Sequence, residues 1–130
     1  MKPERNGVLY CSLFILLLST LHFLYRAVSG FVLLCTATAF GQGVYFAVDF
    51  SYSAQRAYSP PDPNGVKYVF QCRVLTGQFV VGRQDMKEPP QRGSTKFRYD
   101  SVTNSASDPR IFVIFKDTQA YPEYLVSFNG

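Results

Sequence analysis

The sequence has few residues that can bind a metal ion or form a structural disulfide. Its single histidine, His22, lies in an apolar run, and its three cysteines, Cys11, Cys35 and Cys72, are far apart with no Cys-x-x-Cys pair. Structural zinc sites need several such ligands at short spacings, and disulfide-rich domains need cysteines that can pair. The sequence therefore predicts neither a metal site nor a disulfide framework.

Charged residues are also scarce, at 17% of the chain, and lysine and arginine form no dense cluster. Residues 1–40 and 41–130 each contribute half of the net charge of +4, so the longer part is nearly balanced. Nucleic-acid-binding domains usually concentrate basic residues on one face or in one run, so we expect no specific nucleic-acid binding. The hydrophobic fraction of 47% in 130 residues instead predicts one domain with a buried core.

Residues 1–39 form an apolar leader. Its longest apolar run, residues 8–25, is interrupted only by Ser12, Ser19, Thr20 and His22. That run reaches the ~17 to 25 residues that a membrane-spanning helix needs. The basic start and the small residues after the run are also typical of a signal peptide, and both interpretations imply membrane targeting. We expect an apolar N-terminal helix here, with a buried helix and a segment that is not translated in cells as the alternatives.

Residues 40–130 have the pattern of a compact, strand-rich domain. Residues 44–47 are expected to form a strand, and residues 51–58 a short helix with Ser51 as its N-cap. Residues 66–75 alternate, which predicts a strand with its even-numbered residues on the buried face and Lys67, Gln71 and Arg73 on the other.

Further strands are expected at 79–81, at 111–115, where the continuous apolar run predicts burial on both faces, and at 124–128. Residues 83–98 have a net charge of +3 and predict a long polar loop. Loops of this length are usually functional or mobile.

Six segments of this part have a characteristic order and spacing. They are residues 41–47 (GQGVYFA), residues 51–54 (SYSA), Tyr58, residues 73–77 (RVLTG), residues 99–102 (YDSV) and residues 111–125 (IFVIFKDTQAYPEYL). Together they resemble the C-terminal half of the catalytic domain of PARP-type ADP-ribosyltransferases, in particular the mono-ADP-ribosylating subfamily that often carries macrodomains or WWE domains. The resemblance implies an incomplete PARP-type fold of the α+β class over residues 40–130, mainly antiparallel strands with a short helix.

The resemblance also implies NAD+ as the substrate, no metal, and a set of site residues. Tyr45 matches the tyrosine of the family's His-Tyr-Glu signature, which lies against the nicotinamide and its ribose. Ser53 matches the hydroxyl that binds the carboxamide, and Tyr58 matches the ring that stacks on the opposite nicotinamide face. The remaining cofactor-binding residues are Gly43, Phe46 and Ala47. The alternative is that Tyr45 and Tyr58 are ordinary core aromatics.

Two positions depart from the family pattern. Ile111 stands where polymer-forming members have the signature glutamate, and an isoleucine can neither hydrogen-bond the ribose nor activate an incoming one. The signature histidine is absent, because His22 is not followed by glycine. The resemblance therefore implies transfer of a single ADP-ribose to a protein side chain.

The implied protein is an NAD+-dependent mono-ADP-ribosyltransferase of the nucleus or cytoplasm, and this chain is interpreted as a truncated isoform or fragment with weak or no activity. Its implied partners are protein acceptors, whose acidic segments would meet the loop of residues 83–98. The alternatives are an inactive binding module anchored in a membrane through residues 8–25, and a secreted all-β binding protein.

Overall fold

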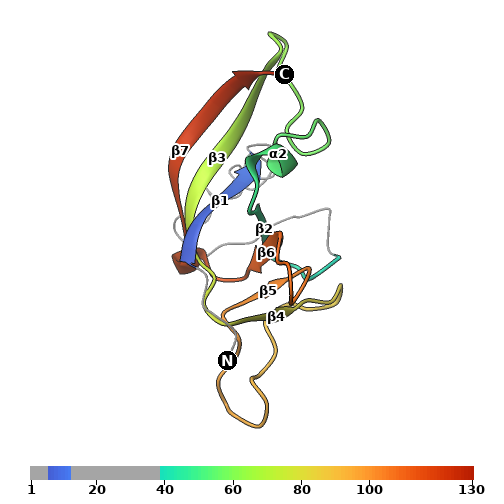
Figure 1. The fold of residues 1–130 in the computed structure, drawn as a ribbon, viewed down its shortest axis with the longest axis vertical. Helices are drawn as coiled ribbons and strands as arrows, with labels where there is room; N and C mark the ends of the chain where they lie inside the picture. Colours follow the sequence, from blue (N-terminus) through green and yellow to red (C-terminus); the bar gives the residue numbers. More distant parts are fainter. Residues whose placement is uncertain (1–5, 13–38) are drawn as a thin grey trace.

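The computed structural model describes residues 6–12 and 39–130. Within them, the strands form one sheet in the order β4-β5-β6-β2-β1-β3-β7, in which β4 and β5 are parallel and the other neighbours are antiparallel (Figure 1). The elements are β1 (Asn6–Ser12), β2 (Val44–Ala47), α2 (Phe50–Ser53), β3 (Val66–Leu75), β4 (Phe79–Val81), β5 (Ser101–Thr103), β6 (Ile111–Ile114), η1 (Asp117–Gln119) and β7 (Ala120–Asn129). The architecture agrees with the expected mainly antiparallel α+β class.

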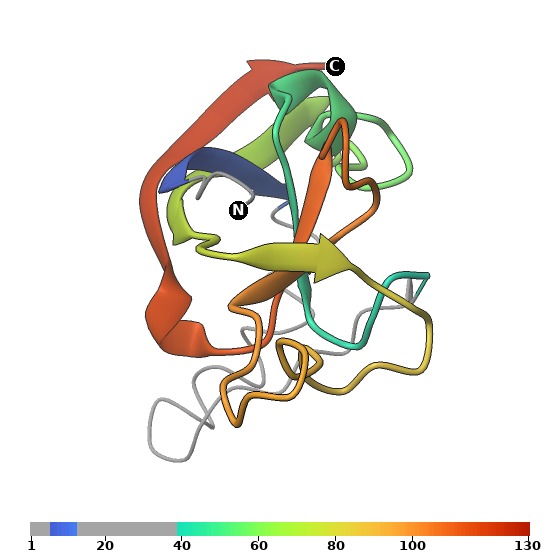
Figure 2. The same ribbon diagram turned by 60° about the horizontal axis from the view of Figure 1, so that its bottom comes forward.

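Strand β6 lies inside the sheet between β5 and β2, and crosses behind β4 in Figure 2. Phe112, Val113 and Ile114 are buried, which confirms the prediction of a strand covered on both faces. β-branched and aromatic residues fit such a strand well because they pack closely on a pleated surface. The Phe112 ring meets Phe79 of β4 edge to face, with centroids 5.2 Å apart. The core around this contact consists of Leu9, Val44, Phe46, Cys72, Val74, Phe79, Phe112 and Ile114.

Strand β3 has the predicted bounds, but its buried face changes along its length. In its second half Cys72 and Val74 are buried, as predicted. In its first half the buried residues are Lys67 and Val69, which belong to the opposite face. The register with β7 shifts between Gln71 and Cys72, where these two stretches meet. The prediction of one buried face for the whole strand was therefore wrong.

Lys67 is buried because its ammonium group has partners. Its Nζ donates a hydrogen bond to the carbonyl of Ala54 and lies 5.5 Å from the centroid of the Phe128 ring. A lysine can be buried in this way when the apolar stem packs and the charged end is satisfied.

The helix is shorter than predicted. It covers Phe50–Ser53 rather than residues 51–58, and its N-cap is Asp49 rather than Ser51, with no side-chain capping hydrogen bond. Turns follow it over residues 54–59, and the prolines at 60 and 61 prevent helix beyond them.

The expectation of an apolar N-terminal helix from residue 8 was also wrong for residues 8–12, which belong to β1. This strand lies between β2 and β3, pairing with β3 along its whole length and with β2 through Tyr10 and Ala47. Leu9 of β1 contributes to the core. The rest of the predicted run, residues 13–25, lies outside the described residues. Among those that are described, no helix is long and apolar enough to cross a membrane.

Candidate functional site

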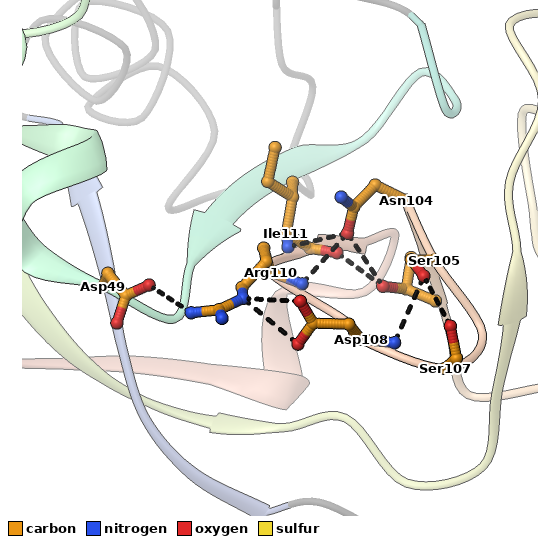
Figure 3. Close-up of polar contacts among 8 residues, drawn as sticks. Asp49, Asn104, Ser105, Ser107, Asp108, Arg110 and Ile111 are labelled. Carbon is orange, nitrogen blue, oxygen red and sulfur yellow. Dashed lines mark hydrogen bonds and ion pairs between the residues drawn. The ribbon is translucent and has the colours of Figure 1, made fainter.

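The main chain at the start of β6 is held by three side-chain hydrogen bonds, shown in part in Figure 3. The Asn104 Oδ1 atom accepts from the backbone N–H groups of Arg110 and Ile111, both at 3.0 Å. On the other side of the residue, the Thr103 hydroxyl donates to the carbonyl of Ile111 at 2.8 Å. Ile111 also pairs with Ala47 of β2 in the sheet. The position of Ile111 is thus fixed by the fold and does not depend on its side chain.

An ion-pair cluster joins the loop of residues 104–110 to the N-cap of α2. Arg110 Nη1 lies 2.9 Å from Asp49 Oδ2, and Arg110 Nε lies 3.1 Å from Asp108 Oδ2 (Figure 3). Hydrogen bonds from the guanidinium to Asp108, and then to Asp49, raise the pKa of Arg110 above its usual value. All three side chains are more than half exposed, so the cluster orients the loop more than it stabilises the protein.

A cavity of about 350 Å³ lies between this loop and α2. Its size lies in the range of small-molecule sites. The residues that line it are Asp49, Ser51, Tyr52, Gln55, Asn104, Arg110 and Ile111. Ile111 is therefore the one predicted site residue that contributes to this lining.

Tyr58 lies beside Tyr52, a residue that the sequence interpretation missed. The two rings stack with centroids 5.1 Å apart and an interplanar angle of 22°, and their hydroxyls are 3.0 Å apart. The hydrogen bond to Tyr58, together with partial burial, raises the pKa of Tyr52 to about 12. The only sequence signal for this pair was two tyrosines near the two ends of an expected helix.

Tyr45 points toward the turn that precedes its own strand. Its hydroxyl donates to the carbonyl of Gly41 at 2.7 Å and accepts from the backbone N–H of Phe40 at 3.1 Å. This places the hydroxyl near the beginning of β2, whereas Ala47 at the end of β2 pairs with Ile111. The structure thus separates the Tyr45 hydroxyl from the cavity that Ile111 lines.

The other predicted cofactor-binding residues are buried. Phe46 belongs to the hydrophobic core, Ala47 is 3% exposed, and Ser53 is buried at the end of α2. Gly43 lies against β6 so closely that an added Cβ would be 2.6 Å from the carbonyl oxygen of Ile114. Packing against β6 alone is therefore enough to require glycine at this position.

The loop of residues 83–98 lies at the other end of β6 from Ile111. The carbonyl of Met86 accepts from the backbone N–H of Gln42, which precedes β2, at 2.7 Å. A Cβ added at Gly41 would meet both Met86 and Phe115, the residue that follows β6. Figure 1 shows the same loop extending below β4 and β5, away from α2. The segment next to Ile111 is instead the shorter loop of residues 104–110.

Among residues 6–12 and 39–130, no group of three or more histidine, cysteine, aspartate or glutamate side chains could hold a metal ion. The cavity beside Ile111 has hydroxyl, amide, aromatic and charged groups around the partly buried start of β6. The fold and this cavity define a mainly antiparallel α+β domain with a small-molecule-sized hollow at the start of β6, where the first side chain of the strand, Ile111, has no titratable group.

The comparison of the sequence with protein families identifies the domain. The chain belongs to the PARP family, because the model described as "Poly(ADP-ribose) polymerase catalytic domain" matches residues 28–130. This confirms the resemblance drawn from the sequence motifs.

Similar proteins support the same assignment. The chain is 47% identical over 95 residues to human protein mono-ADP-ribosyltransferase PARP14, and 50% identical over 91 residues to mouse protein mono-ADP-ribosyltransferase PARP10. These alignments cover 72% and 69% of this chain but only 5% and 10% of the relatives. The chain therefore spans a tenth or less of the length of these two proteins.

The fold has a solved counterpart in the PARP domain of Arabidopsis RADICAL-INDUCED CELL DEATH1. The TM-score is 0.66 at 21% identity, with 96% of this chain and 68% of that domain covered. At this identity the likeness establishes a common fold.

Proposed function

We propose that this chain carries the nicotinamide-side part of an NAD+-dependent ADP-ribosyltransferase domain that transfers one ADP-ribose to a protein side chain. The observation that carries the proposal is the identity of 47% and 50% to two proteins named mono-ADP-ribosyltransferases. Ile111, at the first position of β6 beside the cavity, supports the limitation to a single transfer.

In the proposed reaction the bond between C1′ of the ribose and the nicotinamide nitrogen breaks, and its electron pair leaves with nicotinamide. An oxygen of an acceptor carboxylate forms the new bond to C1′. Such a carboxylate is ionised near pH 7, so this step needs no general base. Elongation would require a base to activate a ribose hydroxyl, and Ile111 has no group that could accept that proton.

In this proposal Tyr58 and Ser53 bind nicotinamide, the first by stacking and the second through its hydroxyl. Tyr45, Phe46 and Ala47 of β2, with Gly43 just before it, form the segment against which that pocket is built. One face of the Tyr58 ring is already stacked on Tyr52, so the other face would meet the ligand. A rigid tyrosine pair loses less conformational entropy on binding than a single mobile ring would.

We further propose that residues 40–130 correspond to the C-terminal half of the catalytic domain and act in the nucleus or cytoplasm. Protein acceptors remain the proposed partners, with acidic segments meeting the basic loop of residues 83–98. Because that loop lies at the far end of β6 from Ile111, it would dock an acceptor rather than present the reacting side chain. A membrane attachment would depend on residues outside the described part of the chain.

A second candidate is a catalytically silent binding module. The observation that favours it is that Tyr45, Ser53 and Tyr58 do not line the cavity beside Ile111, and that the Tyr45 hydroxyl is bonded to the turn before β2. It predicts a chain that keeps its fold and its partner surfaces but has no measurable affinity for NAD+.

Titration with NAD+ and with nicotinamide, followed by NMR, separates the two candidates. For a transferase we expect saturable shifts of the amides around Ser53 and Ile111, and labelling of protein from NAD+ tagged on its adenine. Tyr58→Ala should abolish the shifts, whereas Tyr58→Phe, which keeps the ring, should retain them. Absence of both binding and labelling in the unchanged chain would reject the transferase proposal and favour the binding module.

A further inference from the structure

A second cavity, of about 830 Å³, lies at the opposite end of the sheet from the one that Ile111 lines. It opens between the loop of residues 83–98 and the segment that connects β6 with β7. Leu75, at the end of β3, and Gln119 of η1 lie on its walls. The two cavities share no lining residue.

The charged side chains around this cavity are mainly basic. Four cations line it against two carboxylates, those of Glu88 and Asp100, which leaves a net charge of +2. Each carboxylate already has a partner, because Glu88 pairs with Arg98 at 2.8 Å and Asp100 accepts from the backbone N–H of Gln78 at 2.8 Å. The cations without a carboxylate partner among the described residues are Lys87, Arg92 and Lys116.

Arg92 is the most constrained of these cations. Its Nη1 donates to the side-chain oxygen of Gln78, while its Nε is buried and has no hydrogen-bond partner. A buried polar group without a partner is costly, and the cost is larger for a charged group. The guanidinium is therefore held in place beside the cavity with its charge uncompensated, an arrangement that an anion would stabilise.

An aromatic ring lies at the rim of the same cavity. Phe97 is 58% exposed, and the cationic ends of Arg92 and Lys96 lie 5.9 and 5.8 Å from its ring centroid. An exposed phenylalanine between cations can stack with a planar ring that also carries negative charge.

We propose that this cavity is a binding site for a small molecule that carries two or more linked phosphate groups. The concave shape favours a small ligand over a protein surface, since its volume lies within the range of about 300 to 1,000 Å³ of small-molecule sites. Three uncompensated cations match the charge of a diphosphate. Lys87 lines it from the loop and Lys116 from the segment after β6, and Arg92, bonded to Gln78, supplies a fixed charge next to the connection between β3 and β4.

Inorganic pyrophosphate is the first probe, followed by calorimetry and by NMR of the cavity amides of Gly77 and Thr118. We expect saturable one-to-one binding that saturating nicotinamide does not displace. In the double variant Lys87→Glu/Lys116→Glu we expect a loss of at least about tenfold in affinity. Arg83→Glu is the matched control, because Arg83 is an exposed cation of the same loop that does not line the cavity, and it should stay within about twofold.

A comparison of ADP with pyrophosphate identifies the source of the phosphates. A nucleotide should bind more tightly than pyrophosphate and lose that advantage in Phe97→Ala, whereas an inorganic polyphosphate should be insensitive to Phe97.

Three results would overturn the proposal. They are no saturable binding of pyrophosphate, an equal loss in Arg83→Glu, which would indicate a general charge effect, and displacement of pyrophosphate by stoichiometric RNA, which would indicate a macromolecular interface. Nicotinamide carries no phosphate and its binding is followed at the amides around Ser53 and Ile111, so failure here would leave the proposed transferase activity untouched, and the reverse also holds.

Discussion

Asn104 offers a direct test of how the fold positions the start of β6. Its side-chain oxygen accepts from two consecutive backbone N–H groups, those of Arg110 and Ile111. Both lie where the chain leaves the loop and enters the strand, so no sheet neighbour can replace this acceptor for Arg110. We therefore expect Asn104→Ala to loosen the start of β6 and to leave the rest of the sheet unchanged.

The expected magnitude follows from the two hydrogen bonds. Each contributes about 0.5 to 1.5 kcal/mol net to stability, and Asn104 is half-buried, so solvent can replace part of the interaction. Asn104→Ala should lower the free energy of unfolding by about 1 to 2 kcal/mol. Asn104→Asp keeps an acceptor oxygen at the same place and should cost less than about 0.5 kcal/mol.

Urea unfolding measures the stability change, and amide hydrogen exchange locates it. In Asn104→Ala the amides of Arg110 and Ile111 should exchange faster, while that of Val113 inside β6 should keep its protection relative to global unfolding. The reasoning would be refuted if Asn104→Ala were as stable as the unchanged chain, or if Asn104→Asp lost as much stability as the alanine variant.

Three further predictions concern backbone conformation and titration. Gly77 has φ +55°, and an added Cβ would lie 2.3 Å from the Asp100 carboxylate, whereas Gly65 has φ +79° and open space around it. In thermal unfolding, Gly77→Ala should therefore be less stable than Gly65→Ala by at least about 1 kcal/mol. Equal stabilities of the two variants would contradict this. In the folded protein the pKa of Tyr52 is raised from 10.0 to about 12, so the stability linked to this group should be present below pH 10 and lost as the pH rises toward 12. Tyr58→Phe should bring the pKa of Tyr52 back toward 10, as followed by ultraviolet absorbance. Burial, and secondarily the charge of Glu123, raises the pKa of the Cys72 thiol to about 12. At about pH 8, iodoacetamide should therefore leave this thiol unmodified in the folded chain and modify it in denaturant, as measured by peptide-resolved mass spectrometry. Rapid labelling of the folded chain would show that the thiol is accessible.

Strands with a strong local signal were predictable from the sequence. The run at 111–115 is continuous and apolar. Residues 66–75 are preceded by a turn that is stabilised by hydrogen bonds among its own residues. In that turn Asp62 accepts from the backbone N–H groups of Asn64 and Val66, and the Val66 bond above all lowers the pKa of Asp62. Such signals lie within a few residues of the element that they define.

Features that depend on partners distant in sequence were not predictable. Strand β1 lies at the start of an apolar run that reads equally well as helix, and only its pairing with β2 and β3 makes it a strand. The exchange of the buried face along β3 requires the register shift with β7 and the carbonyl that satisfies Lys67. Neither partner can be identified from the alternation of residues 66–75 alone.

The candidate site was also predictable only in part: the sequence indicated Tyr58, but its stacking on Tyr52 depends on where α2 ends. The sequence placed Tyr58 in the site but extended the helix through residue 58. In such a helix Tyr52 and Tyr58 would lie about 120° apart around the axis, since six residues advance by about 600°, and their rings could not stack. Because the helix ends at Ser53, the following turns bring Tyr58 back over Tyr52, with the rings 5.1 Å apart. The early end of the helix therefore creates the aromatic pair, and the proposed nicotinamide pocket depends on the turn residues 54–59 as much as on the tyrosines themselves.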